Sequence, residues 1–129
     1  RTADGKALLG SRDAMVKGEL PQNLLAGNNT TIGVVATDAL LTKPQAQRLA
    51  QVSHDGLART INPVHTMLDG DTLFALATGH SGKSASMLLL ATLAAEVTAR
   101  AVVNAVCAAQ SLAVNEQTWP AAVDWRPAP

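Results

Sequence analysis

Residues 30–37, Thr-Thr-Ile-Gly-Val-Val-Ala-Thr, form the stretch from which the fold of this chain can be predicted. β-branched and small apolar residues fill it, a composition typical of a strand that is buried on both faces. A polar segment that predicts flexibility, Gly27-Asn28-Asn29, comes directly before it. The sequence therefore predicts a buried strand that begins at Thr30, at the end of a loop.

A helix is predicted after this strand. Thr42 can cap its start, Pro44 is tolerated in its first turn, and Gln45 follows Thr42 by three positions, as in a capping box. Apolar residues then recur at helical spacing. Asn62-Pro63 ends the pattern, because the residue before a proline disfavours helix.

Residues 71–78 (DTLFALAT) predict a second strand that is apolar on both faces, and a long apolar helix is predicted from about residue 84 to about residue 110. Glu96, Arg100 and Asn104 form the polar stripe of that helix, and Glu96 can pair with Arg100. Its longest uncharged stretch is shorter than the roughly 20 residues of a membrane span, so we expect burial between layers or subunits. The order strand, helix, strand, helix predicts the α/β class.

Composition narrows the function classes. The chain has 129 residues, 47% of them hydrophobic, with ten basic and ten acidic side chains and no basic patch. We therefore expect neither nucleic acid nor a membrane as a partner. The single cysteine, Cys107, excludes an internal disulfide, and its apolar surroundings predict a buried thiol. No signal peptide is visible and the first residue is not Met, so we expect a cytoplasmic protein whose chain begins inside a longer gene product.

The first candidate site is Asn29-Thr30-Thr31, where the loop meets the strand. A threonine hydroxyl needs an adjacent base, and an N-terminal threonine can use its own α-amine, whose ordinary pKa is about 7.7–8.0. Such an amine is created by cutting the bond before the threonine, which the hydroxyl itself can attack. Judged on these residues alone, an ordinary strand opening remains the alternative.

The second candidate site is Asp69-Gly70-Asp71, at the entry to the second strand. Carboxylates at positions i and i+2 of an extended chain point to the same side, so one is expected to hold its proton longer. Such a pair can orient and polarise a hydroxyl, although an acidic turn is the simpler alternative. We expect no metal, because the other ligands of a calcium loop are missing. The histidines are too scattered in the sequence to form a metal-ligand set: His54, His65 and His80.

A third candidate lies between the second strand and the long helix. Residues 77–84 (ATGHSGKS) match a loosened phosphate-loop pattern, in which Ala77 replaces the usual first glycine. No later strand supplies the aspartate that would hold magnesium. A plain connection, with Ser81 or Ser84 capping the helix, is the favoured interpretation.

Three stretches of the sequence, taken in order, are informative about the family: residues 27–37 (GNNTTIGVVAT), 63–79 (PVHTMLDGDTLFALATG) and 99–106 (ARAVVNAV). In order and spacing they resemble the L-aminopeptidase/D-esterase family of N-terminal-nucleophile-like hydrolases, which includes the nylon-oligomer hydrolases. The resemblance covers most of the chain up to Leu112. It implies that the chain is part of an αββα sandwich, made from a precursor that cleaves itself into a large and a small subunit.

The same resemblance implies roles for individual residues. Thr30 would be the nucleophile and Asn29 the residue before the cut, a junction similar to that of the nylon-oligomer hydrolases. Asp69 and Asp71 would be the acidic pair beside the nucleophile. No cofactor and no nucleotide is expected. Residues 1–29 would end the large subunit, residues 30–112 would form the small subunit, and residues 113–129 would be an irregular tail.

The resulting functional prediction is a self-processing amide-bond hydrolase, cleaved between Asn29 and Thr30. The implied substrates are peptides, amino-acid amides or ω-amino-acid oligomers. The implied protein partners are the remainder of the large subunit, which would supply a lysine, an asparagine and much of the pocket, and further copies in a homo-oligomer. Two alternatives stay open: a nucleotide-binding module that uses residues 77–84, and a non-catalytic assembly fragment.

Overall fold

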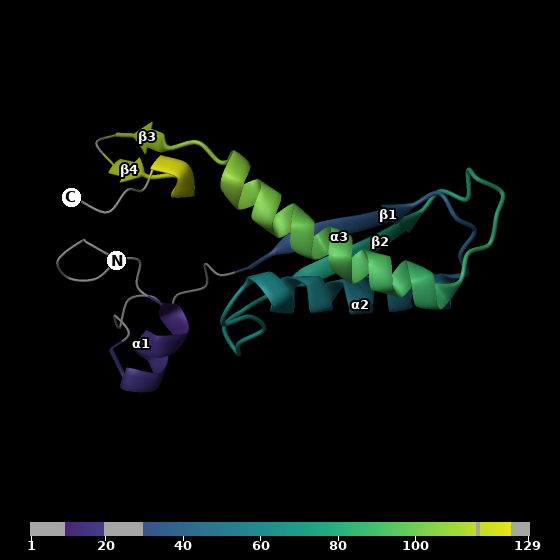
Figure 1. The fold of residues 1–129 in the computed structure, drawn as a ribbon, viewed down its shortest axis with the longest axis horizontal. Helices are drawn as coiled ribbons and strands as arrows, with labels where there is room; N and C mark the ends of the chain where they lie inside the picture. The colour runs from purple at the N-terminus through teal and green to yellow at the C-terminus, as the bar shows by residue number, and fades with distance from the viewer. Residues whose placement is uncertain (1–9, 20–29, 116, 125–129) are drawn as a thin grey trace.

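The computed structural model describes residues 10–19, 30–115 and 117–124. Its centre consists of β1 (Ile32–Thr37), α2 (Lys43–Thr60), β2 (Thr72–Ala77) and α3 (Met87–Ala108), in that order. This confirms the predicted α/β class and the order strand, helix, strand, helix. β1 and β2 pair in parallel, with Ile32 opposite Thr72, and Figure 1 shows α2 and α3 running alongside this two-stranded sheet.

Among the described residues, helices cover one face of the β1–β2 sheet. Val35 of β1 packs with Leu49 of α2 and Ala94 of α3 to form the core of the described residues. The opposite face carries large apolar side chains that are 53–73% exposed: Ile32, Val34, Phe74 and Leu76. Within the described residues the prediction that β1 is buried on both faces is therefore wrong, because α2 and α3 form a single layer on one side.

α2 begins and ends where the sequence predicts. Gln45 Oε1 accepts a hydrogen bond from the Thr42 N–H at 2.8 Å, which confirms the predicted capping box. The helix ends at Thr60, just before Asn62-Pro63, as predicted.

α3 begins later than predicted. Ser86 is at its N-cap position, so neither Ser81 nor Ser84 caps it. The predicted pair on its polar stripe is confirmed, since Arg100 Nε lies 2.8 Å from Glu96 Oε1. The predicted burial is not: most of the helix is exposed, and Cys107 is exposed instead of buried. Much of the partner surface for this apolar helix is therefore absent from the described residues.

By length and composition alone, α3 is apolar enough to cross a membrane. This is weak evidence for a membrane span, because the core helices of soluble proteins share these properties. Glu96 and Arg100 lie near its middle, and charged side chains at that depth in a bilayer are costly.

Regular structure also occurs before Thr30 and in the stretch predicted to be an irregular tail. α1 (Ser11–Lys17) ends at Gly18, whose φ of 70° gives the left-handed geometry common after helices. β3 (Leu112–Val114) and β4 (Gln117–Trp119) form an antiparallel pair, followed by a 3₁₀ turn, η2 (Ala122–Asp124). The prediction of irregular chain is wrong for these residues. They are too short for hydrophobic periodicity to reveal them.

A glycine determines how closely α2 and α3 approach. A methyl group on Gly56 would lie 2.5 Å from the carbonyl oxygen of Ala95 and 2.6 Å from Cβ of Thr98. Neither neighbour is the end of a flexible side chain, so a larger residue requires the helices to separate. The close packing that buries Leu57 beside Gly56 depends on this gap.

We expect Gly56→Ala to destabilise the protein, although alanine is the better helix former. Overpacking costs about 1–3 kcal/mol, whereas the gain in helix propensity is at most about 1 kcal/mol. Urea unfolding of the full-length protein should therefore show a net loss of free energy of unfolding. Asp55→Ala is the control, because Asp55 is adjacent but exposed. A Gly56→Ala protein as stable as the parent would contradict the close helix contact.

Candidate active site

The N-terminal ends of β1 and β2 bring together the first two candidate sites of the sequence. Parallel strands start at the same edge of a sheet. The register places Ile32 opposite Thr72, and the Thr72 N–H donates to the Thr31 carbonyl at 2.8 Å. Thr30 and Thr31 therefore lie beside Asp69-Gly70-Asp71, although about 40 residues separate them in the chain.

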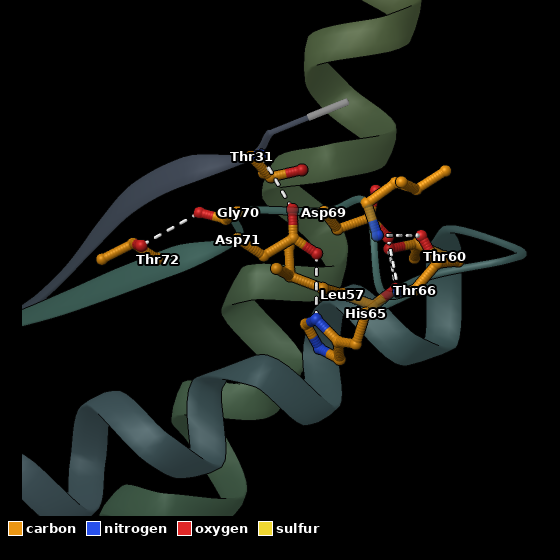
Figure 2. Close-up of polar contacts among 10 residues, drawn as sticks. Thr31, Leu57, Thr60, His65, Thr66, Asp69, Gly70, Asp71 and Thr72 are labelled. Carbon is orange, nitrogen blue, oxygen red and sulfur yellow. Dashed lines mark hydrogen bonds and ion pairs between the residues drawn. The ribbon is translucent and has the colours of Figure 1, made fainter. Parts of the chain in front are cut away.

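Gly70 provides the space for the Thr30 side chain. A methyl group on Gly70 would lie 2.9 Å from Thr30 Oγ1, so the hydroxyl occupies space beside this glycine that a side chain would otherwise fill. Thr30 is otherwise exposed. The Gly70 carbonyl accepts a hydrogen bond from Thr72 Oγ1 at 3.0 Å (Figure 2). A hydroxyl in this position is accessible to a substrate and close to the acidic turn.

Asp71 is a buried carboxylate with two partners (Figure 2). Its side chain is only 4% exposed. Oδ1 accepts the Thr31 N–H at 2.8 Å, and Oδ2 lies 2.9 Å from Nδ1 of His65. Burial by itself would raise the pKa of Asp71, but hydrogen bonding by Thr31 and the nearby His65 outweigh it and bring the pKa below its ordinary value. Asp71 is therefore ionised at neutral pH.

Asp69 has a different partner. Its Oδ2 accepts the Thr66 N–H at 2.6 Å, and its own N–H donates to the Thr66 carbonyl at 3.1 Å. These two bonds close the turn that leads into β2. Among the described residues, neither Asp69 nor Asp71 hydrogen-bonds the Thr30 hydroxyl. Each carboxylate holds a separate stretch of backbone, and the joint action of both on one hydroxyl stays a prediction.

His65 is the site residue that the sequence analysis missed. The sequence shows it only as one of three histidines that are too scattered to predict a metal-ligand set. In the structure its backbone has a φ of 54°, and its ring contacts both Asp71 and the ring of His54 on α2. One signal was available in the sequence. The Pro63–Thr66 stretch joins a helix end to the acidic turn, so it must lie at the same sheet edge.

The phosphate-loop candidate lies at the other end of the sheet. Ser81 donates from its N–H and its hydroxyl to the Asp38 carbonyl, and the Lys83 carbonyl accepts the Leu40 N–H, so this loop is tied to the end of β1. α3 starts at Met87, after Ser84, whereas a phosphate loop needs those residues in the first helical turn. The geometry argues against a nucleotide site here.

Two further predictions bear on the site. Within the described ranges, no three His, Cys, Asp or Glu side chains cluster closely enough to hold a metal ion. Asn29, the predicted residue before the cut, lies outside the described residues. The subunit boundaries after residues 29 and 112 stay predictions.

Comparison with known proteins identifies the family of this chain. The model of Peptidase family S58 matches residues 4–119. An uncharacterized aminopeptidase of Mycobacterium leprae is 48% identical over 102 residues, which are 69% of this chain and 28% of that protein. An uncharacterized aminopeptidase of Mycobacterium tuberculosis is 67% identical over 51 residues, which are 40% of this chain and 15% of that protein.

A hydrolase with a more specific name is also similar. The 6-aminohexanoate-oligomer endohydrolase of a Kocuria species is 40% identical over 60 residues, which are 46% of this chain and 17% of that enzyme. The chain thus spans between about a sixth and somewhat over a quarter of the length of these relatives. Since the family model matches nearly the whole chain, the chain belongs to peptidase family S58, the L-aminopeptidase/D-esterase family of amide-hydrolysing enzymes.

Proposed function

We propose that this chain carries the nucleophile of a self-processing amide-bond hydrolase, cleaved between Asn29 and Thr30. The observation that carries the proposal is the position of Thr30. Its hydroxyl is exposed and rests against Gly70, and the next peptide N–H is held by the buried carboxylate of Asp71. A nucleophile needs both access and a fixed backbone.

Processing uses the same hydroxyl as catalysis. Thr30 Oγ attacks the Asn29 carbonyl carbon, the peptide C–N bond breaks, and the nitrogen takes up a proton to become the α-amine of Thr30. Water hydrolyses the resulting ester and releases the carboxylate of Asn29. Thr30 is then N-terminal, and its amine can accept the proton of its own hydroxyl.

In the mature enzyme, Thr30 Oγ attacks the carbonyl carbon of a substrate amide. The α-amine takes the hydroxyl proton and passes it to the leaving nitrogen as the substrate C–N bond breaks. The acyl group stays on Oγ as an ester until water hydrolyses it. Substrates of the family suggest a peptide, an amino-acid amide or an ω-amino-acid oligomer, in keeping with the names of the similar aminopeptidases and the oligomer endohydrolase.

Asp71 and Asp69 are positioning residues in this proposal. The carboxylate of Asp71 holds the Thr31 N–H at 2.8 Å, and this restrains the peptide plane that follows Thr30. Asp69 closes the turn that presents Gly70 to the Thr30 side chain. The geometry favours these roles over direct polarisation of the hydroxyl by either carboxylate.

The rest of the large subunit is the proposed cover for the open face of the sheet. The exposed apolar side chains of β1 and β2 suit a second sheet, as in an αββα sandwich. A groove of about 400 Å³ also runs between β1 and the second half of α3, lined by residues such as Val35, Val97 and Val102.

Outward side chains of α3, among them Leu88 and Leu89, support a homo-oligomer.

We expect Thr30→Ala to abolish both processing and hydrolysis in the full-length precursor. Loss of a covalent nucleophile lowers the rate by about 10³-fold or more. Gel electrophoresis of the purified protein should show one uncut chain. Hydrolysis of an amino-acid amide and of a 6-aminohexanoate oligomer, followed by release of free amine, should fall to background.

Two control variants of the precursor should still be cut. Thr30→Ser keeps a hydroxyl and should still be cut and active. Thr31→Ala should also be cut, because it leaves in place the backbone N–H by which Thr31 contacts Asp71. A Thr30→Ala protein that is cut at the same bond, or that hydrolyses either substrate at the parent rate, would show that Thr30 is not the nucleophile.

We expect Asp71→Asn to slow processing by roughly tenfold, the equivalent of 1.36 kcal/mol in the barrier. The amide keeps the shape of the carboxylate but removes its charge and replaces one of its two accepting oxygens by an N–H donor. The fraction of cut chain over time measures this rate. Asp55→Asn, at an exposed position of α2, is the matched control. An Asp71→Asn precursor that matures as fast as the control would rule out a role for this charge.

A further inference from the structure

The contact between His65 and Asp71 has a defined direction. Asp71 is ionised and its Oδ2 can only accept a hydrogen bond, so Nδ1 of His65, 2.9 Å away, must carry the proton. His65 therefore donates to one oxygen of the carboxylate while the Thr31 N–H donates to the other. A carboxylate is planar, so a donor that holds one oxygen also limits where the other can point.

The ring of His65 is itself held in place. It lies against the ring of His54 on α2, with the centroids 4.9 Å apart and the planes tilted by 53°. Its backbone has a φ of 54°, which directs the side chain back toward the start of β2. The His65 side chain is 37% exposed whereas that of Asp71 is 4% exposed. His65 is thus the outer partner of the pair.

We propose that His65 is a positioning residue for the nucleophile, acting through Asp71 and the Thr31 backbone. Its donor fixes the Asp71 carboxylate, the carboxylate fixes the Thr31 N–H, and the restrained peptide sets the direction of the Thr30 side chain. This inference rests on the proposed function, since it assigns His65 a part in presenting the Thr30 hydroxyl. Without the donor, the carboxylate can rotate toward solvent and the peptide after Thr30 loses its restraint.

The unusual backbone of His65 allows the donor to be tested apart from the fold. Glycine and asparagine both tolerate a positive φ, but only asparagine can replace the lost N–H donor. His65→Gly and His65→Asn in the full-length precursor therefore differ mainly in that donor. His80→Gly, at an exposed position beyond the far end of the sheet, is the control for inserting a flexible residue.

For the mature enzyme, we expect His65→Gly to lower kcat by roughly tenfold or more, with KM little changed, because a charge-assisted hydrogen bond is lost from the positioning chain. His65→Asn should restore kcat to within about threefold of the parent, since it supplies a donor at similar reach. His80→Gly should behave as the parent. Equal kcat values for His65→Gly and His65→Asn, whether high or low, would overturn the proposal.

A second readout does not depend on the nucleophile. In the uncut Thr30→Ala precursor, hydrogen–deuterium exchange of the Thr31 amide, followed by mass spectrometry of a peptide that spans it, reports the bond to Asp71. We expect exchange about tenfold faster with His65→Gly and near the parent rate with His65→Asn. Unchanged exchange with His65→Gly would refute the positioning role. Activity retained by Thr30→Ala would refute the proposed function instead, and the exchange result would still stand.

Discussion

The carboxylate of Asp71 is the interaction on which the site depends. A buried charge is costly unless it is paired and hydrogen-bonded, and Asp71 has a partner on each oxygen. One partner is the backbone at the start of β1, and the other is His65 in the loop before β2. The same side chain therefore joins two strand ends and a loop. Since the Thr30 hydroxyl lies one residue before the Thr31 N–H, the position of the candidate nucleophile follows from this bridge.

The parallel pairing of β1 and β2 makes the bridge possible, and α2 makes the pairing possible. A parallel pair needs a crossover, which α2 supplies, and α2 is held close to α3 at Gly56. This layer covers one face of the sheet only. Among the described residues, the other face of the sheet and much of α3 stay exposed, and this chain spans 28% of the length of its Mycobacterium leprae relative. The site is built at an edge, where additional chain can complete a pocket around Thr30.

The central elements could be predicted from the sequence because their signals are local and strong. A β-branched run indicated β1 and an apolar run indicated β2, and the Thr42–Gln45 capping box and Asn62-Pro63 indicated the limits of α2. The juxtaposition of Thr30 with Asp69 and Asp71 came from the family resemblance, and the structure shows the strand pairing that produces it. The different hydrogen-bond partners of Asp69 and Asp71 could not be predicted from the sequence. They depend on the positive φ of His65 and on a turn at Thr66. Which face of the sheet is exposed could not be predicted either, because both strands are apolar on both faces.

The most direct test of the central claim is the N-terminal residue of the small fragment in the purified, full-length, mature protein. Intact mass and N-terminal sequencing together identify it. The account predicts a fragment that begins at Thr30 with a free α-amine, and a companion fragment that ends at Asn29. An active enzyme that remains a single chain, or one whose small fragment begins at any other residue, would contradict it.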